Sequence, residues 1–187
     1  MILIQNLKKM SGLGTKKVET SAGIPIWQRP PQNAQGGFGL DMAGLSEGVN
    51  IPAGTLTVYD EGTRFAKVIK SARAYEAVSV ASTTVKVAKG NFYLKGDSFK
   101  SKTVSAIDTT NEAYDVFTLS EGVTVNKDEV VYSEAVTNKK TGLLYSGVEA
   151  STNEVVSVAI AGTVYARRIP PVESNSLPPT IILSNSF

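Results

Sequence analysis

The sequence has 187 residues, 42% of them hydrophobic, which is enough chain to bury the core of one domain. Its 19 Lys and Arg residues nearly balance 17 Asp and Glu residues, so the net charge gives no indication of a nucleic-acid partner. Cys and His are absent, which excludes disulfides, thiolate and imidazole metal sites, and catalysis by a Ser-His-Asp triad.

Neither a signal peptide nor a membrane-spanning segment is predicted. The apolar start covers only residues 1–4, and Lys8 and Lys9 follow it, whereas the basic residues of a signal peptide precede its apolar stretch. No run approaches the roughly 20 apolar residues of a spanning helix. We therefore expect a protein made in the cytoplasm, without a membrane partner.

Proline placement divides the chain into three parts. Four of the 8 prolines lie before Ala53 and the other four after Ile169. Because proline cannot donate a hydrogen bond to a β-ladder, the proline-free stretch predicts a β-rich body between two extended ends. The expected parts are an arm over residues 1–45, a body over residues 46–169 and a tail over residues 170–187.

The arm has few large apolar side chains, so we expect it to bury too little surface to fold alone and to be dispensable for folding of the body. Residues 1–29 hold five basic side chains against one acidic side chain, whereas the rest of the chain is slightly acidic. This pattern fits either a solubilising tail or an arm that docks on an acidic surface through an aromatic anchor. The predicted docking contacts are Lys8, Lys9, Lys16, Lys17, Trp27, Arg29 and Phe38.

The body is predicted to be β throughout. Polar and apolar residues alternate with a period of two, and clusters of Gly, Asn, Asp and Ser separate the alternating segments. The predicted strands are residues 55–59, 77–81, 84–88, 104–107, 116–119, 130–133, 155–160 and 162–166. Such short strands fit a small β-barrel or β-sandwich, built either as one unit or as two barrel-like subdomains.

Two segments of the body leave alternatives open. Residues 63–75 have apolar residues at helical spacing, but Gly62 precedes them without a good N-cap, which favours a strand. The sequence Ser-Glu-Gly-Val occurs at residues 46–49 and again at 120–123. Each copy is followed by an apolar residue and then by a turn with Gly or Asp. We interpret these as tight turns that lead into strands, because four identical residues do not establish a duplication.

No catalytic residue, cofactor or metal site is predicted. The acidic side chains are scattered and mostly flank predicted turns. Asp108 and Glu112 bound an oxygen-rich segment that lacks the spacing of a calcium loop, so we interpret it as a hairpin connection. Ser98 and Lys100 share a strand face, as many residue pairs do by chance. These observations give little support to an enzyme that uses carboxylates.

The C-terminal end combines an arginine pair with an apolar strand. The arginines suit carboxylates on a partner or a second subunit, although a solvated strand end explains them equally well. An exposed apolar strand would be prone to aggregation, so we expect it to pair with a sheet edge of this chain or of a neighbour. The predicted subunit contacts are Arg167, Arg168, Ile181, Ile182, Leu183 and Phe187.

Two motifs in this end, AGTVYARRIP at residues 161–170 and LPPTIILSNSF at residues 177–187, resemble the C-terminal end of head fibre or head decoration proteins of tailed bacteriophages and prophages. Shorter matching segments lie at residues 87–90, 95–97, 104–111, 114–119 and 127–131. The likeness covers roughly residues 50–187 and rests on turn-and-strand patterns. The long basic arm and an extra barrel-like segment depart from the smaller decoration proteins.

The resemblance implies a structural virion protein. In that family, trimers sit on the outside of the icosahedral head and reinforce contacts between major capsid subunits. It therefore implies a homotrimer on the outer capsid surface, with the major capsid protein as partner. The alternative is a cell-surface or carbohydrate-binding β module, which a virion could also carry. Its sugar platforms would be Tyr59, Tyr93, Tyr132 and Tyr165, although tyrosines at these positions also suit a core or an interface.

Overall fold

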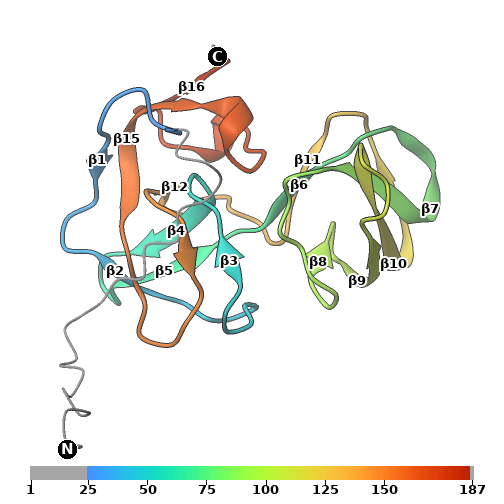
Figure 1. The fold of residues 1–187 in the computed structure, drawn as a ribbon, viewed down its shortest axis with the longest axis horizontal. Helices are drawn as coiled ribbons and strands as arrows, with labels where there is room; N and C mark the ends of the chain where they lie inside the picture. The colour runs from blue at the N-terminus through green and yellow to red at the C-terminus, as the bar shows by residue number, and fades with distance from the viewer. Residues whose placement is uncertain (1–24, 186–187) are drawn as a thin grey trace, which may run out of the picture.

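The computed structural model describes residues 25–185 (Figure 1). These residues form β-strands and two short 3-10 helices, and no α-helix occurs among them. The predicted mainly β fold class is confirmed. Every strand predicted in the body overlaps an observed strand, because alternating side chains place one apolar row against a core.

The chain forms two lobes, which lie on the left and on the right in Figure 1. We call residues 71–131 the small lobe, and residues 25–70 together with 132–185 the large lobe. One cluster of buried apolar side chains belongs wholly to the small lobe, and the buried members of the other two belong to the large lobe. The chain therefore builds two separate cores, although Phe92 of the small lobe also packs against the large lobe.

The large lobe contains ten strands and both 3-10 helices. Its elements are β1 (Gln32–Asn33), β2 (Phe38–Leu40), β3 (Asn50–Ile51), β4 (Leu56–Asp60), β5 (Phe65–Val68), β12 (Thr141–Leu144), β13 (Val148–Glu149), β14 (Val155–Val156), β15 (Val158–Tyr165), η1 (Ala166–Arg168), η2 (Ser174–Ser176) and β16 (Ile181–Ser184). The small lobe contains β6 (Ser71–Arg73), β7 (Val78–Ala88), β8 (Ser98–Phe99), β9 (Lys102–Asp108), β10 (Tyr114–Val125) and β11 (Val130–Tyr132), apart from Tyr132, the last residue of β11, which belongs to the large lobe.

The main sheet of the large lobe is curled like a half-barrel. Its strand order is β1-β15-β12-β4-β5-β2-β14, and β16 pairs with β15. Since only Ser157 separates β14 from β15, the strand at one end of this sheet and the strand next to its other end lie on one stretch of chain. One face buries Phe38, Leu40 and Val158. On the opposite face, the C-terminal segment places Leu177 among the buried side chains.

The small lobe is built around strands β7 and β10. These strands pair along most of their length, with β9 and β8 beyond them, and β6 pairs with β11. The side chains of Phe99 and Phe117 are fully buried, and Tyr93 packs against both rings. Residues 63–75, which the sequence assigned to a strand in preference to a helix, form β5 and β6.

The tight turns expected after the two Ser-Glu-Gly-Val copies are confirmed, because the Thr55 amide donates to the Pro52 carbonyl and the Glu129 amide donates to the Asn126 carbonyl, just before β4 and β11. The copy at residues 120–123 itself lies within a strand. These residues continue β10, and the pairing with β7 shifts from Thr118 opposite Thr84 to Val123 opposite Ser82. The extra residues bulge out of the ladder, so the strand bends without ending. The matching sequence at residues 46–49 does form a turn, in which the Val49 amide donates to the Ser46 carbonyl. The same four residues thus take two different structures.

The expectation that residues 1–45 bury little surface is wrong for residues 25–45. Strand β2 lies between β5 and β14 in the curled sheet, and it buries Phe38 and Leu40. Upstream, the Gln28 amide donates to the Thr163 carbonyl at 3.0 Å, and the Tyr165 amide donates to the Ile26 carbonyl at 2.9 Å. The apolar residues of this segment are few, but several of them occupy core positions.

One buried ion pair joins the two lobes. The chain passes between the lobes at Lys70 and Ser133, where the Ser133 amide donates to the Lys70 carbonyl at 2.8 Å. The Lys70 ammonium donates to both carboxylate oxygens of Asp97 at 2.7 Å, and Lys70 is only 3% exposed. The Tyr93 hydroxyl also donates to the Lys70 carbonyl. These bonds hold the small lobe against the large lobe at the point where the chain crosses between them.

Gly142 in β12 permits the close approach of β15. A Cβ atom at this position would lie 2.6 Å from the Ala159 carbonyl oxygen and 2.6 Å from Cγ1 of Val158. Gly142→Ala should therefore destabilise the protein by about 1–3 kcal/mol, since the neighbouring backbone must shift. Urea unfolding measures this loss. Gly62→Ala is the control, because its Cβ would meet only a carboxylate oxygen of Asp60. An equal effect at both glycines would contradict the prediction.

Candidate interaction surfaces

An exposed apolar row crosses the outer face of the curled sheet. Gly39 in β2 pairs with Phe65 of β5 on one side and with Val155 of β14 on the other. Phe65 is 56% exposed and Val155 is 47% exposed. A Cβ on Gly39 would lie 3.1 Å from the Phe65 ring, so the ring lies over the glycine. We call Phe65, Gly39 and Val155 the apolar row.

Arg64 holds the apolar row in place. Its backbone has a φ of 61°, a left-handed conformation that is uncommon for a residue other than glycine. Its guanidinium donates to the Gln35 carbonyl at 2.6 Å and to the Gly37 carbonyl at 2.7 Å, and it lies 4.3 Å from the centre of the Phe38 ring. The side chain thus ties the connection before β2 to the start of β5, so Phe65 sits on a preorganised part of the sheet.

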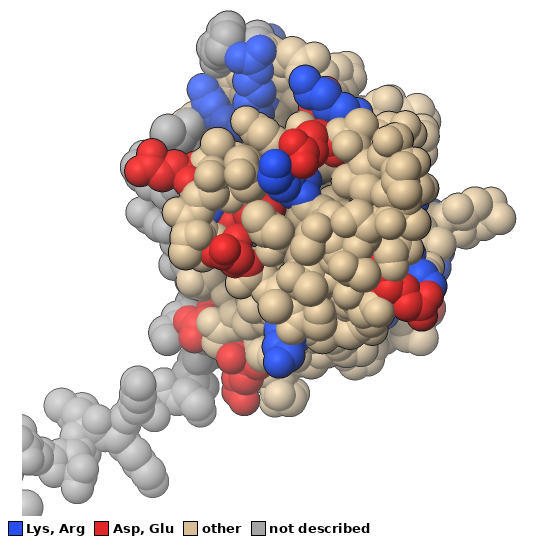
Figure 2. All heavy atoms as spheres, turned by 90° about the vertical axis from the view of Figure 1, so that its right-hand side faces the viewer, with Lys and Arg blue, Asp and Glu red and all other residues tan. Residues whose placement is uncertain are grey.

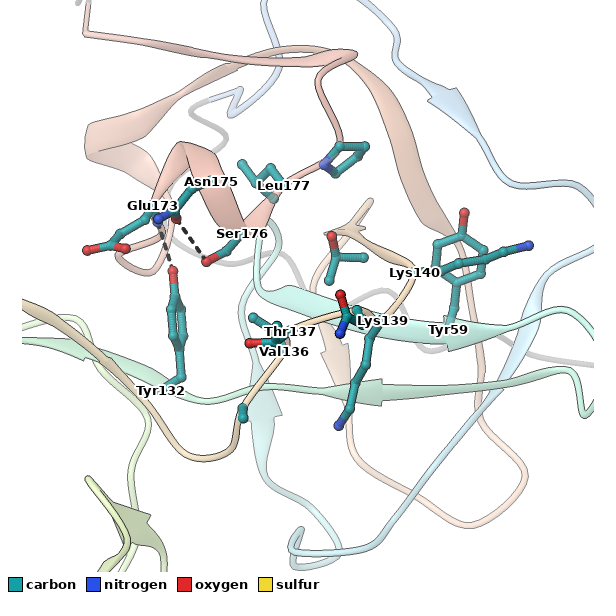
Figure 3. A pocket seen from close by; sticks show the side chains of 14 residues that line it. Tyr59, Tyr132, Val136, Thr137, Lys139, Lys140, Glu173, Asn175, Ser176 and Leu177 are labelled. Carbon is teal, nitrogen blue, oxygen red and sulfur yellow. Dashed lines mark hydrogen bonds between the residues drawn. The ribbon is translucent and has the colours of Figure 1, made fainter.

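A hollow of about 720 Å³ opens between the connection that precedes β12 and the segment around η2 (Figure 3). Tyr59 and Tyr132 both line it, but they stand on opposite sides. The Tyr132 hydroxyl accepts the Glu173 amide at 2.8 Å, and burial raises the pKa of Tyr132. The Tyr59 ring packs edge-on against Phe38. Both tyrosines make contacts within the fold, and they do not together form a platform on which a sugar could stack.

The other two predicted sugar platforms do not lie in the hollow. Tyr93 is buried in the core of the small lobe, where burial raises its pKa. Tyr165 lies beneath the Arg168 guanidinium, 4.2 Å from the centre of its ring. The prediction that these four tyrosines could offer sugar platforms is therefore wrong for Tyr93, and the other three are engaged within the large lobe.

The structure instead brings together two tyrosines that sequence reasoning missed. Tyr75 and Tyr114 lie on the outer face of the small lobe with ring centres 5.1 Å apart. Alternation in residues 114–119 would have placed Tyr114 on that face. The position of Tyr75 depends on a hydrogen bond that its backbone amide donates to the Lys86 carbonyl, eleven residues away, and no local pattern shows this contact.

Of the predicted docking contacts, only three lie in the described part of the chain. The prediction that Phe38 contacts a partner is wrong, because its side chain is buried in the core and only 1% exposed. Trp27 is half-buried, with its indole NH donating to the Tyr145 carbonyl at 3.0 Å and its ring stacked on Tyr145. Arg29 is exposed. The remaining contacts, Lys8, Lys9, Lys16 and Lys17, lie outside the described residues.

The predicted subunit contacts are divided between interior and surface. Strand β16 pairs with β15 of its own chain, which confirms the expected pairing with a sheet edge. Ile181 is therefore buried and Leu183 partly buried within the chain, so neither side chain requires a neighbouring subunit to cover it. Ile182 remains 60% exposed. Phe187 lies outside the described residues.

Arg167 and Arg168, the other predicted subunit contacts, are both exposed in η1. The Arg168 guanidinium donates to the Pro25 carbonyl at 2.8 Å and stacks on Tyr165. This arginine therefore anchors the first described residue to the end of β15. Within the chain it therefore holds the backbone at Pro25 against the large lobe.

Side chains with catalytic potential are engaged in turns and ion pairs. Asp108 accepts the Thr110 amide, which lowers its pKa, and it begins the connection between β9 and β10, so the predicted hairpin is confirmed. Lys100 pairs with Glu129 and does not face Ser98. Within residues 25–185 no group of three acidic side chains is arranged to hold a metal ion. No helix in that range is long and apolar enough to cross a membrane.

Comparisons of the chain with known protein families, with characterised proteins and with solved structures found no match.

Proposed function

We propose that this protein is a non-enzymatic structural virion protein that binds the outside of a phage capsid as a head decoration or head fibre protein. Its partner would be the major capsid protein, and it would assemble as a homotrimer. The observation that carries this proposal is the apolar row on the large lobe. Exposed apolar side chains that are clustered and held rigidly are typical of surfaces that another protein covers.

Attachment would have two components. The capsid would bury Phe65 and Val155, which are preorganised by Gly39 and Arg64, so this contact would mainly slow dissociation. The lysines at positions 8, 9, 16 and 17 would attract an acidic capsid face and mainly speed association, because exposed charges act at long range and are screened by salt. Ile182, exposed on the edge strand β16, would lie where copies of the chain meet.

Binding to purified, undecorated heads tests the capsid contact. Phe65→Ser combined with Val155→Ser should weaken binding at least tenfold and act on the dissociation rate. Both side chains are about half exposed, so the fold should tolerate the change, and thermal unfolding checks this. Val80→Ser is the matched control, since Val80 is 79% exposed but lies in the small lobe.

The proposal is wrong if the folded double variant binds heads as tightly as the unaltered protein does. Heads of the correct phage are needed, and they are those whose genome encodes the protein. Light scattering on the free and bound protein measures the mass of the oligomer, and a stable monomer in both states would contradict the homotrimer.

A further inference from the structure

We infer that the outer face of the small lobe binds a neutral saccharide through Tyr75 and Tyr114. This site is separate from the apolar row, which lies on the large lobe. Tyr75 is 43% exposed, and the planes of the two rings are inclined by 42° at a centre-to-centre distance of 5.1 Å. Tyr114 is partly buried, so the two rings form one aromatic cluster in which Tyr75 is the ring more open to solvent.

The strands beside the two rings carry mostly short side chains on the same face. Residues 84, 86 and 88 of β7 alternate with the buried Val85 and Val87, so they face outward. On the same face, Tyr114 lies opposite Ala88, and Val116 lies opposite Lys86. Most of these neighbours are short, so the tyrosine rings rise above the sheet. A rigid aromatic ring that projects beyond its short neighbouring side chains can stack on the flat C–H face of a sugar ring.

A charged pair adjoins the two rings, and its ammonium lies over the Tyr114 ring. The Lys86 ammonium lies 5.0 Å from the centre of the Tyr114 ring and 3.1 Å from the Glu76 carboxylate. A carboxylate accepts hydrogen bonds and an ammonium donates them, so together they match hydroxyl groups that do both. Because Glu76 and Lys86 neutralise each other, the site favours an uncharged ligand.

The charge of the lobe argues against a nucleic-acid ligand, although bases also stack on tyrosine. Residues 71–131 hold seven basic and eight acidic side chains. Figure 2 shows the side of the molecule formed by the small lobe, where the charged side chains lie in small separate groups of both signs. A polyanion needs a continuous basic surface to neutralise its phosphates. A neutral sugar does not require a basic surface.

A protein partner is less well matched to this face. Protein interfaces bury a central cluster of large apolar side chains. Here the large side chains are Tyr75, Tyr114 and the partly buried Val116, and the neighbouring positions hold Thr84 and Ala88. This area fits one or two sugar units better than the surface of a folded protein.

An array of neutral oligosaccharides built from glucose, galactose and N-acetylglucosamine tests the inference with the full chain. The unaltered protein should bind a subset of them, and Tyr75→Ala combined with Tyr114→Ala should weaken that binding at least tenfold. Thermal unfolding should show that the variant is folded. Tyr145→Ala is the matched control, because Tyr145 is an exposed tyrosine that also packs on another aromatic ring.

Three outcomes would overturn the inference. The unaltered protein could bind no oligosaccharide on the array, or the folded double variant could bind as well as the unaltered protein. The double variant could also lose binding to undecorated heads, which would assign this face to a protein partner. Phe65→Ser with Val155→Ser should leave saccharide binding unchanged, so failure of the proposed capsid contact is distinguishable from failure of this site.

Discussion

A chain that begins at residue 46 is expected not to form the large lobe, whereas one that begins at residue 25 is expected to fold as the full chain does. The longer truncation removes β1 and β2 and leaves β5 and β14 without the strand between them. It also removes Phe38 and Leu40 from the core. Loss of the Phe38 side chain alone should cost about 3–5 kcal/mol, a large part of the stability of a typical domain.

Circular dichroism and urea unfolding of the two truncated chains measure the difference. The chain from residue 25 retains every strand of the described fold, so its unfolding midpoint should stay close to that of the full chain. Phe38→Ala in the full chain is the intermediate case and should unfold at a lower urea concentration. A chain from residue 46 with the stability of the full protein would show that residues 25–45 are not part of the core.

The same pair of truncations separates folding from capsid attachment. Removal of residues 1–24 takes away four lysines and one glutamate, so binding to undecorated heads should become slower and less dependent on salt. Equal association rates for the truncated and full chains at low salt would mean that the lysines only solubilise the protein.

Asp97→Ala is expected to cost about 3–5 kcal/mol, the usual effect of removing one partner of a buried ion pair. The Lys70 ammonium would keep its buried position and lose both of its 2.7 Å carboxylate contacts. The Leu94 amide, which donates to the same carboxylate, would also lose its acceptor. Because Lys70 lies at the crossing between the lobes, this loss should loosen the attachment of the small lobe as well.

Urea unfolding measures the cost of Asp97→Ala, and small-angle scattering detects any change in the arrangement of the lobes. Adding Lys70→Met to Asp97→Ala should recover part of the stability, since no unpaired charge then remains buried. The control is Glu61→Ala, which breaks the exposed pair with Lys140 and should cost less than about 1 kcal/mol. Equal costs for the buried and exposed pairs would contradict the prediction.

Local patterns in the sequence were sufficient for the strands and several turns. Alternation placed Val85 and Val87 on one face of β7, and both are buried. Aspartates at turns behaved as expected, because Asp60 and Asp108 each accept the amide two residues later. These features depend on neighbours in the chain, so a sequence displays them directly.

The composition of residues 25–45 indicated less burial than the structure shows. Their glycines and prolines indicated an extended arm, and the segment is indeed extended, but β2 lies inside the main sheet. Whether a strand is central or peripheral depends on which distant strands flank it. Phe38 therefore appeared as a free contact residue, although Val156 and Tyr59, far away in the sequence, help to enclose it.

The tertiary structure alone decided the surfaces on which function is proposed. Gly39 brings Phe65 and Val155 together because β2 pairs with both of their strands, and Tyr75 meets Tyr114 because the chain folds back against Lys86. Likewise, β16 pairs with β15 of the same chain and not with a strand of a neighbouring subunit. Periodicity determines which face a side chain takes within its strand, whereas strand order and register determine which side chains share a surface.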